Sequence, residues 1–267
     1  MFNNNFLLGG TSGTPKLHDA NSWESKELYN YNWNLYINSI FWHPGGLKFY
    51  VVDNQNDWLF EYTVTSAWDI LTAVNTQSMS LIEFTASFSG NIFFNQDGTK
   101  LIVGAYGSYN GIRSCDLAVV TLPTPWVLVR GGYDFVQVAA EGELIRSFKL
   151  TDDGLNLYVA LFDEVRLYKL SSPFNFASKV FLGSFFPNVL YPVINVSKDG
   201  KKLYVASQIS GIIQEYTMTT ANDLTTLVWT DTGTNITDSV LAFCFSGDGK
   251  FLYTADAFSG IRRAKLT

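Results

Sequence analysis

Few residues of this chain are suited to acid–base chemistry. The 267 residues include two histidines, His18 and His43. His43 lies three residues before Gly46, and the equivalent position of four similar segments holds a short polar residue: Asn95, Thr151, Ser197 or Ser246. Because such side chains bond to the backbone of turns, we expect His43 to cap a turn rather than act as a general base. The sequence therefore predicts a protein that is not an enzyme and has no cofactor.

Metal binding is equally poorly supported. Residues 95–98, Asn-Gln-Asp-Gly, are similar to the start of an EF-hand calcium loop, but no such segment has the bidentate glutamate that the loop requires. The two cysteines, Cys115 and Cys244, lie in repeats that are not neighbours, without a nearby histidine or basic cluster. We expect both to be free and buried, with no disulfide and no metal site.

Surface recognition is the remaining chemistry that the sequence supports. Aromatic rings and amides recur in the predicted loops between second and third strands, a composition suited to stacking on sugars and to contacts with proteins. The candidate binding residues are Asn56, Trp58, Tyr106, Tyr109, Phe162 and Phe258. Because the loops differ in length, we expect one asymmetric binding face rather than five equivalent sites. Ordinary solvated loops are the alternative interpretation.

A repeated hairpin pattern predicts the elements that position these loops. Residues 193–205 contain an apolar run, a polar turn with Asp-Gly, and a second apolar run, which is typical of a β-hairpin. The pattern recurs at 40–52, 92–103, 148–159 and 243–254, and its turn glycines lie 46 to 56 residues apart. Repeats of this length with about four strands each are typical of propeller blades. We predict an all-β, five-bladed β-propeller of four-stranded antiparallel blades.

The ends of the predicted propeller complement each other. The fifth repeat has a third strand at 261–266 but no fourth. Residues 21–24, Asn-Ser-Trp-Glu, match the Ser-Ala-Trp-Asp of residues 66–69, so we expect residues 24–31 to supply the missing outer strand. An N-terminal strand would then close the ring and remove two sheet edges. The predicted domains are an arm or linker at 1–20 and a propeller at 21–267.

The predicted arm carries apolar anchors for a partner. Phe2, Phe6, Leu7 and Leu8 are more apolar than a solvated tail requires, so we expect them to dock on another subunit. The same segment lacks a basic n-region, so we expect no secretory signal peptide.

Composition excludes several functions. The net charge of −6 argues against nucleic acid as a partner, because phosphate binding needs a basic surface. No apolar run approaches the roughly 20 residues that cross a bilayer, so we expect no membrane insertion. The hydrophobic fraction of 47% is ample for a core.

The repeats resemble a known family. Residues 198–206, Lys-Asp-Gly-Lys-Lys-Leu-Tyr-Val-Ala, and residues 211–216, Gly-Ile-Ile-Gln-Glu-Tyr, resemble YVTN-type β-propeller repeats. Residues 62–72 look like the variant of this repeat found in bacterial surface proteins and in virion proteins of tailed bacteriophages. The resemblance covers residues 21–267, and propellers of this type include lactonases, lectin-like binders and structural parts of virions.

The resemblance is specific for the fold and leaves these functions open. The short apolar arm, the Asn/Thr/Ser-rich composition and the expected lack of a signal peptide favour a non-enzymatic virion protein of a bacteriophage, either structural, a capsid decoration or part of a tail fibre. Such a protein would assemble in the host cytoplasm. It would contact other virion proteins through its arm, and a host-surface glycan or protein through its ring. The alternatives are a lectin-like, carbohydrate-binding propeller and a lactonase-type hydrolase. The hydrolase would need loops to supply its catalytic groups.

Overall fold

The computed structural model describes residues 23–26, 29–30, 33–82, 88–106, 116–140, 143–235, 239–256 and 260–266. The predicted arm, residues 1–20, lies outside these ranges, together with Cys115. Within them, no helix is long and apolar enough to cross a membrane.

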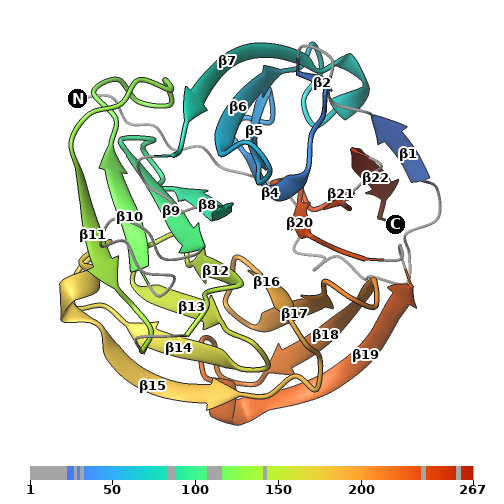
Figure 1. The fold of residues 1–267 in the computed structure, drawn as a ribbon. Helices are drawn as coiled ribbons and strands as arrows, with labels where there is room; N and C mark the ends of the chain where they lie inside the picture. The colour runs from blue at the N-terminus through green and yellow to red at the C-terminus, as the bar shows by residue number, and fades with distance from the viewer. Residues whose placement is uncertain are drawn as a thin grey trace, which may run out of the picture.

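The protein is a five-bladed β-propeller, as predicted (Figure 1). Each blade is a four-stranded antiparallel sheet whose first strand lies nearest the central axis. Blade 1 contains β4 (Ile37–Trp42), β5 (Lys48–Asp53), β6 (Trp58–Thr63) and β7 (Val74–Ser80). Blade 2 contains β8 (Phe88–Phe94), β9 (Lys100–Tyr106), β10 (Asp116–Thr121) and β11 (Tyr133–Gln137). Blade 3 contains β12 (Ser147–Leu150), β13 (Asn156–Ala160), β14 (Val165–Lys169) and β15 (Val180–Phe185). Blade 4 contains β16 (Pro192–Val196), β17 (Lys202–Ser207), β18 (Ile212–Met218) and β19 (Leu227–Asn235).

Blade 5 is completed from the other end of the chain. It contains β20 (Ala242–Phe245), β21 (Phe251–Ala255) and β22 (Ile261–Lys265), and its outer strand is β1 (Trp23–Lys26), which pairs with β22 (Figure 1). The predicted closure of the ring is therefore confirmed. Its bounds were wrong, because β1 begins at Trp23, whereas β2 (Tyr29–Asn30) and β3 (Trp33–Asn34) form a separate two-stranded sheet.

The turns between first and second strands have the predicted chemistry. Their glycines adopt left-handed backbone, with φ of 67° at Gly200 for example, which a side chain would disfavour. The Asp199 carboxylate accepts a hydrogen bond from the Lys201 N–H at 3.0 Å and so caps its turn. In blade 1, His43 Nδ1 accepts from the Gly45 N–H at 3.0 Å, which confirms the predicted capping role of this histidine.

A second repeated feature lies in the connections between third and fourth strands. One residue per connection adopts positive φ, donates its N–H to the carbonyl oxygen of the turn glycine, and lays its side chain over that glycine. We call these four the clamp residues: Trp68, Trp126, Phe174 and Asn222. Their N–H···O distances to Gly46, Gly98, Gly154 and Gly200 are 2.8, 2.9, 3.0 and 2.8 Å. Each clamp joins the outer half of a blade to its inner hairpin.

The core lies between adjacent blades. The second strands carry four equivalent tyrosines, Tyr50, Tyr158, Tyr204 and Tyr253, each at most 1% exposed. Apolar residues on both faces of these strands are buried, because each strand packs between two neighbouring blades. Cys244 is free and buried, as expected, and burial raises the pKa of its thiol to about 12.

Candidate contact surface

The propeller has two unlike faces. One face, here called the turn face, carries the glycine turns and the clamp residues. The opposite face, the loop face, carries the connections between second and third strands and those between blades. The four candidate binding residues that the structure describes, Asn56, Trp58, Tyr106 and Phe162, belong to the loop-face connections or to the strand ends beside them.

Three of these candidates have described side chains. Asn56 is exposed and donates from Nδ2 to the Asp53 carboxylate at 2.7 Å, so it braces its own loop. Trp58 is 37% exposed and stacks on Phe60. Phe162 is 48% exposed. Tyr106 ends β9 and is described by its backbone, whereas the remaining predicted residues lie outside the described ranges: Tyr109, Phe258, Phe2, Phe6, Leu7 and Leu8.

Phe162 belongs to a larger apolar cluster that the structure brings together. Its ring meets the Tyr191 ring edge-on at 5.0 Å, and its carbonyl oxygen accepts from the Tyr191 N–H at 2.8 Å. The carbonyl oxygen of Tyr191 in turn accepts from the Gln208 N–H at 3.3 Å, which links blades 3 and 4. Exposed apolar side chains continue along these segments. We call this cluster the blade 3–4 patch: Phe162, Phe186, Leu190, Tyr191 and Ile209.

The backbone that carries this patch is firmly held. Asn188 and Tyr191 both adopt positive φ, at 55° and 54°, which is uncommon outside glycine and often marks functional segments. The Pro187 carbonyl oxygen accepts from the Tyr216 hydroxyl at 3.1 Å, and the Leu190 carbonyl oxygen accepts from Ser207 Oγ at 3.1 Å. The segment is therefore fixed in one conformation by hydrogen bonds from blade 4, and binding would cost little ordering entropy.

Charged groups border the patch. The Arg146 guanidinium lies 4.3 Å from the centroid of the Tyr191 ring. Arg166 donates two hydrogen bonds to the Glu143 carboxylate, at 2.7 and 2.8 Å, and one to Glu164 at 2.9 Å. Hydrogen bonds from Arg166 hold the pKa of Glu143 below its ordinary value. An apolar centre with arginine and carboxylates around it is the usual composition of a protein-binding surface.

A separate set of exposed apolar side chains lies on the outer strands of the same two blades. Val180, Phe181 and Leu182 of β15 are exposed by 50% or more, as are Val228 and Trp229 of β19. Both strands are the outermost of their sheets (Figure 1), and these residues lie beside the ends of β14 and β18 that are nearer the turn face. Exposed apolar edges of this kind are prone to pair with another chain.

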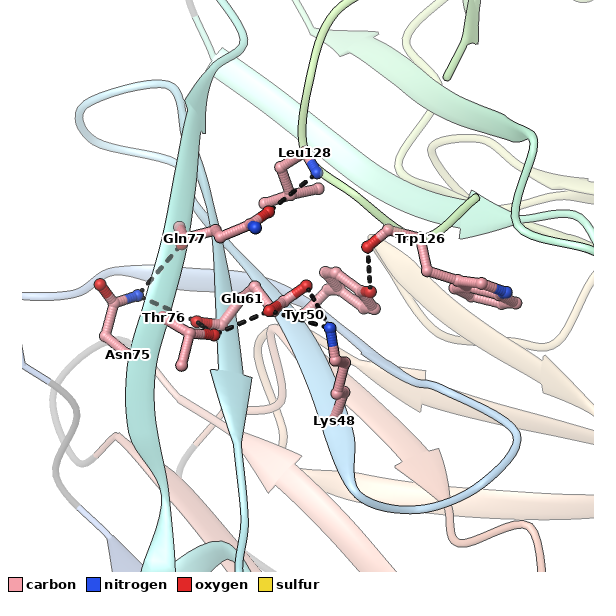
Figure 2. Close-up of polar contacts among 8 residues, drawn as sticks. All are labelled: Lys48, Tyr50, Glu61, Asn75, Thr76, Gln77, Trp126 and Leu128. Carbon is pink, nitrogen blue, oxygen red and sulfur yellow. Dashed lines mark hydrogen bonds and ion pairs between the residues drawn. The ribbon is translucent and has the colours of Figure 1, made fainter. Parts of the chain in front are cut away.

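A buried polar network elsewhere is structural. Figure 2 shows Glu61, 2% exposed, between Lys48 at 3.2 Å and the Thr76 hydroxyl at 2.7 Å. In the same region Tyr50 donates to the Trp126 carbonyl oxygen at 3.0 Å, and the Leu128 N–H donates to Gln77 Oε1 at 3.0 Å (Figure 2). These bonds join blade 1 to blade 2. Because Glu61 is occupied by partners within the fold, we assign it no catalytic role.

Lys149 lies on β12, the first strand of blade 3. The Lys149 amine is 5.3 Å from the centroid of the Phe93 ring, and burial lowers its pKa. The nearby Cys244 thiol has a raised pKa and would not assist Lys149 as a base, so we assign this lysine no catalytic role. Among the described residues, no group of three His, Cys, Asp or Glu side chains is placed to hold a metal ion.

Sequence reasoning found Phe162 but missed the rest of the patch. Two signals were present: Phe185 and Phe186 form an aromatic pair at the end of β15, and Pro187-Asn188 marks a turn. Neither signal indicates that the Tyr191 ring packs against the Phe162 ring.

Comparisons with known proteins support the architecture. No family model and no curated protein matches this chain. Among solved structures, a "putative 6-phosphogluconolactonase" from Bacteroides uniformis has a TM-score of 0.50 and 17% identity, covering 86% of this chain and 69% of that one. A functionally unknown protein from Desulfotomaculum acetoxidans has a TM-score of 0.47 and 11% identity, covering 82% of this chain and 62% of that one. At these identities the first likeness shows the fold alone, and the second carries no argument.

Proposed function

We propose that this protein is a non-enzymatic propeller that binds another macromolecule, in the first instance a protein, through the blade 3–4 patch. The observation that carries the proposal is the apolar cluster itself, exposed on a backbone that hydrogen bonds hold in place. Monomeric proteins seldom expose such clusters without a partner. Arg146 and the Glu143–Arg166–Glu164 group would give the contact its specificity.

We further propose that the contact is made in a virion of a tailed bacteriophage, as a structural, decoration or tail-fibre part. This proposal rests on the resemblance of residues 198–206 and 211–216 to YVTN-type repeats, and of residues 62–72 to the variant found in such particles. The partners would be other virion proteins, reached through the apolar residues of segment 1–20, and a host-surface protein or glycan. Assembly would take place in the host cytoplasm.

Mass spectrometry of purified phage particles tests the location, and a paired substitution tests the surface. Phe162→Ser with Leu190→Ser removes two exposed side chains, 48% and 45% exposed, from the patch. Leu47→Ser is the matched control, because Leu47 is 51% exposed on the turn face. We expect the double variant to be missing from purified particles or to lose its binding to the host receptor. The Leu47→Ser variant should be incorporated and should bind as the wild type does. Equal retention of both would contradict the proposal.

A lectin-like function is the second candidate. The edge-on pair of Phe162 and Tyr191, with Arg146 beside it, supplies ring faces and donors suited to a sugar. Binding on a glycan array that Tyr191→Ala abolishes would favour this candidate over protein contact. Turnover in a lactone-hydrolysis screen would instead support the hydrolase and contradict a purely binding role.

A further inference from the structure

The outer strand of blade 3 has apolar side chains exposed on both of its faces. Val180 and Phe181 of β15 are 61% and 54% exposed, and Leu182 is 50% exposed. Because consecutive residues of a strand point to opposite faces, the exposure of Val180 and Phe181 means that neither face is covered at this end of the strand. In the described part of the chain β15 pairs with β14 alone, so no strand lies beside its outer edge (Figure 1). Such an edge offers backbone N–H and C=O groups to another extended chain.

The other outer strands contain residues that discourage such pairing. β11, β19 and β1 each contain a carboxylate residue in their sequences: Asp134, Asp231 and Glu24. β7 (Val-Asn-Thr-Gln-Ser-Met-Ser) is mainly polar. β15, by contrast, reads Val-Phe-Leu-Gly-Ser-Phe and has no charge. Charged and polar residues are the usual protection of a sheet edge, and their scarcity in β15 makes it the outer strand best suited to pairing.

A bulge in β15 does not protect its edge. The register with β14 shifts between Leu167 and Tyr168, which leaves Leu182 opposite no residue. β7 and β19 show a register shift at the equivalent place of their blades, so this bulge belongs to the repeated architecture and is not a special feature of β15. Beyond it, Gly183–Phe185 continue the regular pairing with β14.

Opposite charges lie beside the two ends of β15. Its first residue, Val180, follows Lys179 and pairs with Lys169 of β14. Beside its other end three carboxylates outnumber one guanidinium: Glu143, Asp163 and Glu164, with Arg166. Asp152 and Asp153 also lie on the turn face, but they belong to the inner hairpin, and its nearer strand, β13, is two strands from this edge. The edge is therefore positive at its start and negative at its end.

A second copy of the same strand matches this distribution when it runs antiparallel. The start of each β15 then lies beside the end of the other, so the lysines of one copy face the carboxylates of its partner twice about a two-fold axis. A parallel arrangement would instead bring lysines to lysines and carboxylates to carboxylates. Because β15 itself contains no charge, antiparallel pairing sets no like charges opposite each other between the two strands.

We propose that two copies of this chain form a two-fold dimer by antiparallel pairing of their β15 strands. The sheet of one blade 3 then continues into the sheet of the other, and the exposed apolar side chains of both strands are covered. The proposal does not rest on the proposed function, because Phe162 and Leu190 of the blade 3–4 patch lie outside β15. Phe162→Ser with Leu190→Ser should therefore leave the dimer intact.

Substitutions at equivalent positions of two outer strands test which edge is used. Phe181 pairs with Tyr168 in blade 3 as Trp229 pairs with Tyr216 in blade 4, and the two rings are 54% and 57% exposed. In sedimentation equilibrium over a range of protein concentrations, we expect Phe181→Lys to raise the dissociation constant of the dimer about tenfold or more. Trp229→Lys is the matched control and should leave it unchanged. A protein that stays monomeric, or a dimer that both substitutions weaken equally, overturns the proposal.

A pair of charge reversals tests the antiparallel arrangement. Lys169→Glu with Lys179→Glu makes both ends of the edge negative, and Asp163→Lys makes its acidic end more positive. Each variant alone should dimerise more weakly than the wild type. A mixture of the two should associate more tightly than either variant alone, because every contact then joins opposite charges, and added salt should reduce this difference. A mixture that associates no more tightly than the separate variants overturns the antiparallel arrangement.

Amide exchange identifies the occupant of the edge. We expect the protection of the β15 amides to rise with protein concentration, because a second copy then pairs with them, and that of the β19 amides to stay constant. Protection of β15 that is independent of concentration would overturn the proposal by assigning the edge to another segment of the same chain. Rapid exchange of the outer-edge amides at every concentration would overturn it as well, since no strand would then cover the edge.

Discussion

The turn face and the loop face of this propeller differ in how strictly they repeat. On the turn face, four blades share one arrangement, in which a positive-φ clamp residue covers a positive-φ glycine at nearly constant distance. On the loop face, Asp57, Gly211 and Gly260 adopt positive φ directly before third strands. Positive φ at Asn188 and Tyr191 occurs instead in the connection between blades 3 and 4, and it has no described counterpart in the other connections between blades. Positive φ that repeats from blade to blade therefore belongs to the architecture of the propeller. Positive φ that occurs in a single connection between blades marks that connection as a candidate for recognition.

The largest loss of stability is expected from a substitution at a turn-face glycine. In Gly154→Val the new Cβ would lie 2.6 Å from the Phe174 ring, on a backbone with φ of 67°. We expect a loss of about 3 kcal/mol or more in the free energy of unfolding, measured by denaturant titration. Gly183→Val is the control, because a Cβ added at Gly183 would meet no atom within 4 Å. Similar losses in both variants would show that the clamp does not constrain this glycine.

A smaller loss of stability is expected when one hydroxyl between blades 3 and 4 is removed. Tyr158 donates to Asn222 Oδ1 at 3.0 Å, so Tyr158→Phe should cost about 1 kcal/mol. A double-mutant cycle with Asn222→Ala should show that the two losses are not additive. Tyr158→Phe combined with Tyr50→Phe, which affects a different pair of blades, should be additive. Additivity in both cycles would mean that the clamp does not join these blades.

The Glu143–Arg166 pair on the loop face should make the stability of the protein depend on pH. The pKa of Glu143 is lowered chiefly by its hydrogen bonds from Arg166, so their contribution to stability is present above the ordinary carboxyl pKa of 4.5 and is lost as the pH falls through the lowered value. The stability difference between wild type and Arg166→Met should therefore be largest near neutral pH and shrink in acid. Lys198→Met removes one positive charge from an exposed turn and serves as the control. A difference that stays constant with pH would contradict this assignment.

The smallest effect on stability is expected at the patch itself. Phe162→Ser removes an exposed ring, and we expect the free energy of unfolding to change by about 0.5 kcal/mol or less. Binding of the partner should nevertheless fall sharply, because rings at the centre of an interface carry much of its energy. Calorimetric unfolding and a binding titration on the same sample separate the two quantities. A large loss of stability would place Phe162 in the architecture instead.

The sequence was sufficient for the repeated part of the molecule. Asp-Gly turns and consecutive apolar residues have direct local causes, so the five blades and the closing strand could be predicted from them. The clamp could not, because nothing in Trp126 or Phe174 indicates a left-handed backbone. The match of residues 21–24 with 66–69 was misleading, because Trp23 lies in strand β1 whereas Trp68 is a clamp residue with φ of 67°.

The candidate surface was predicted only in part. Phe162 was identified from its loop, but Tyr191 lies in a different connection. The two rings come into contact because hydrogen bonds from the Ser207 and Tyr216 hydroxyls hold the backbone of that connection in place. Such long-range contacts leave no periodic pattern in the sequence.

The pairing of β1 with β22 has a consequence for biosynthesis. A ribosome makes Trp23–Lys26 before any blade and Ile261–Lys265 after all the others, so the earliest strand must wait for the latest one. During this interval the growing sheet stack is an open arc with two unpaired edges, which favours association between nascent chains. Translation speed and chaperone access late in synthesis should therefore govern the yield of native protein more than the intrinsic strength of any single blade.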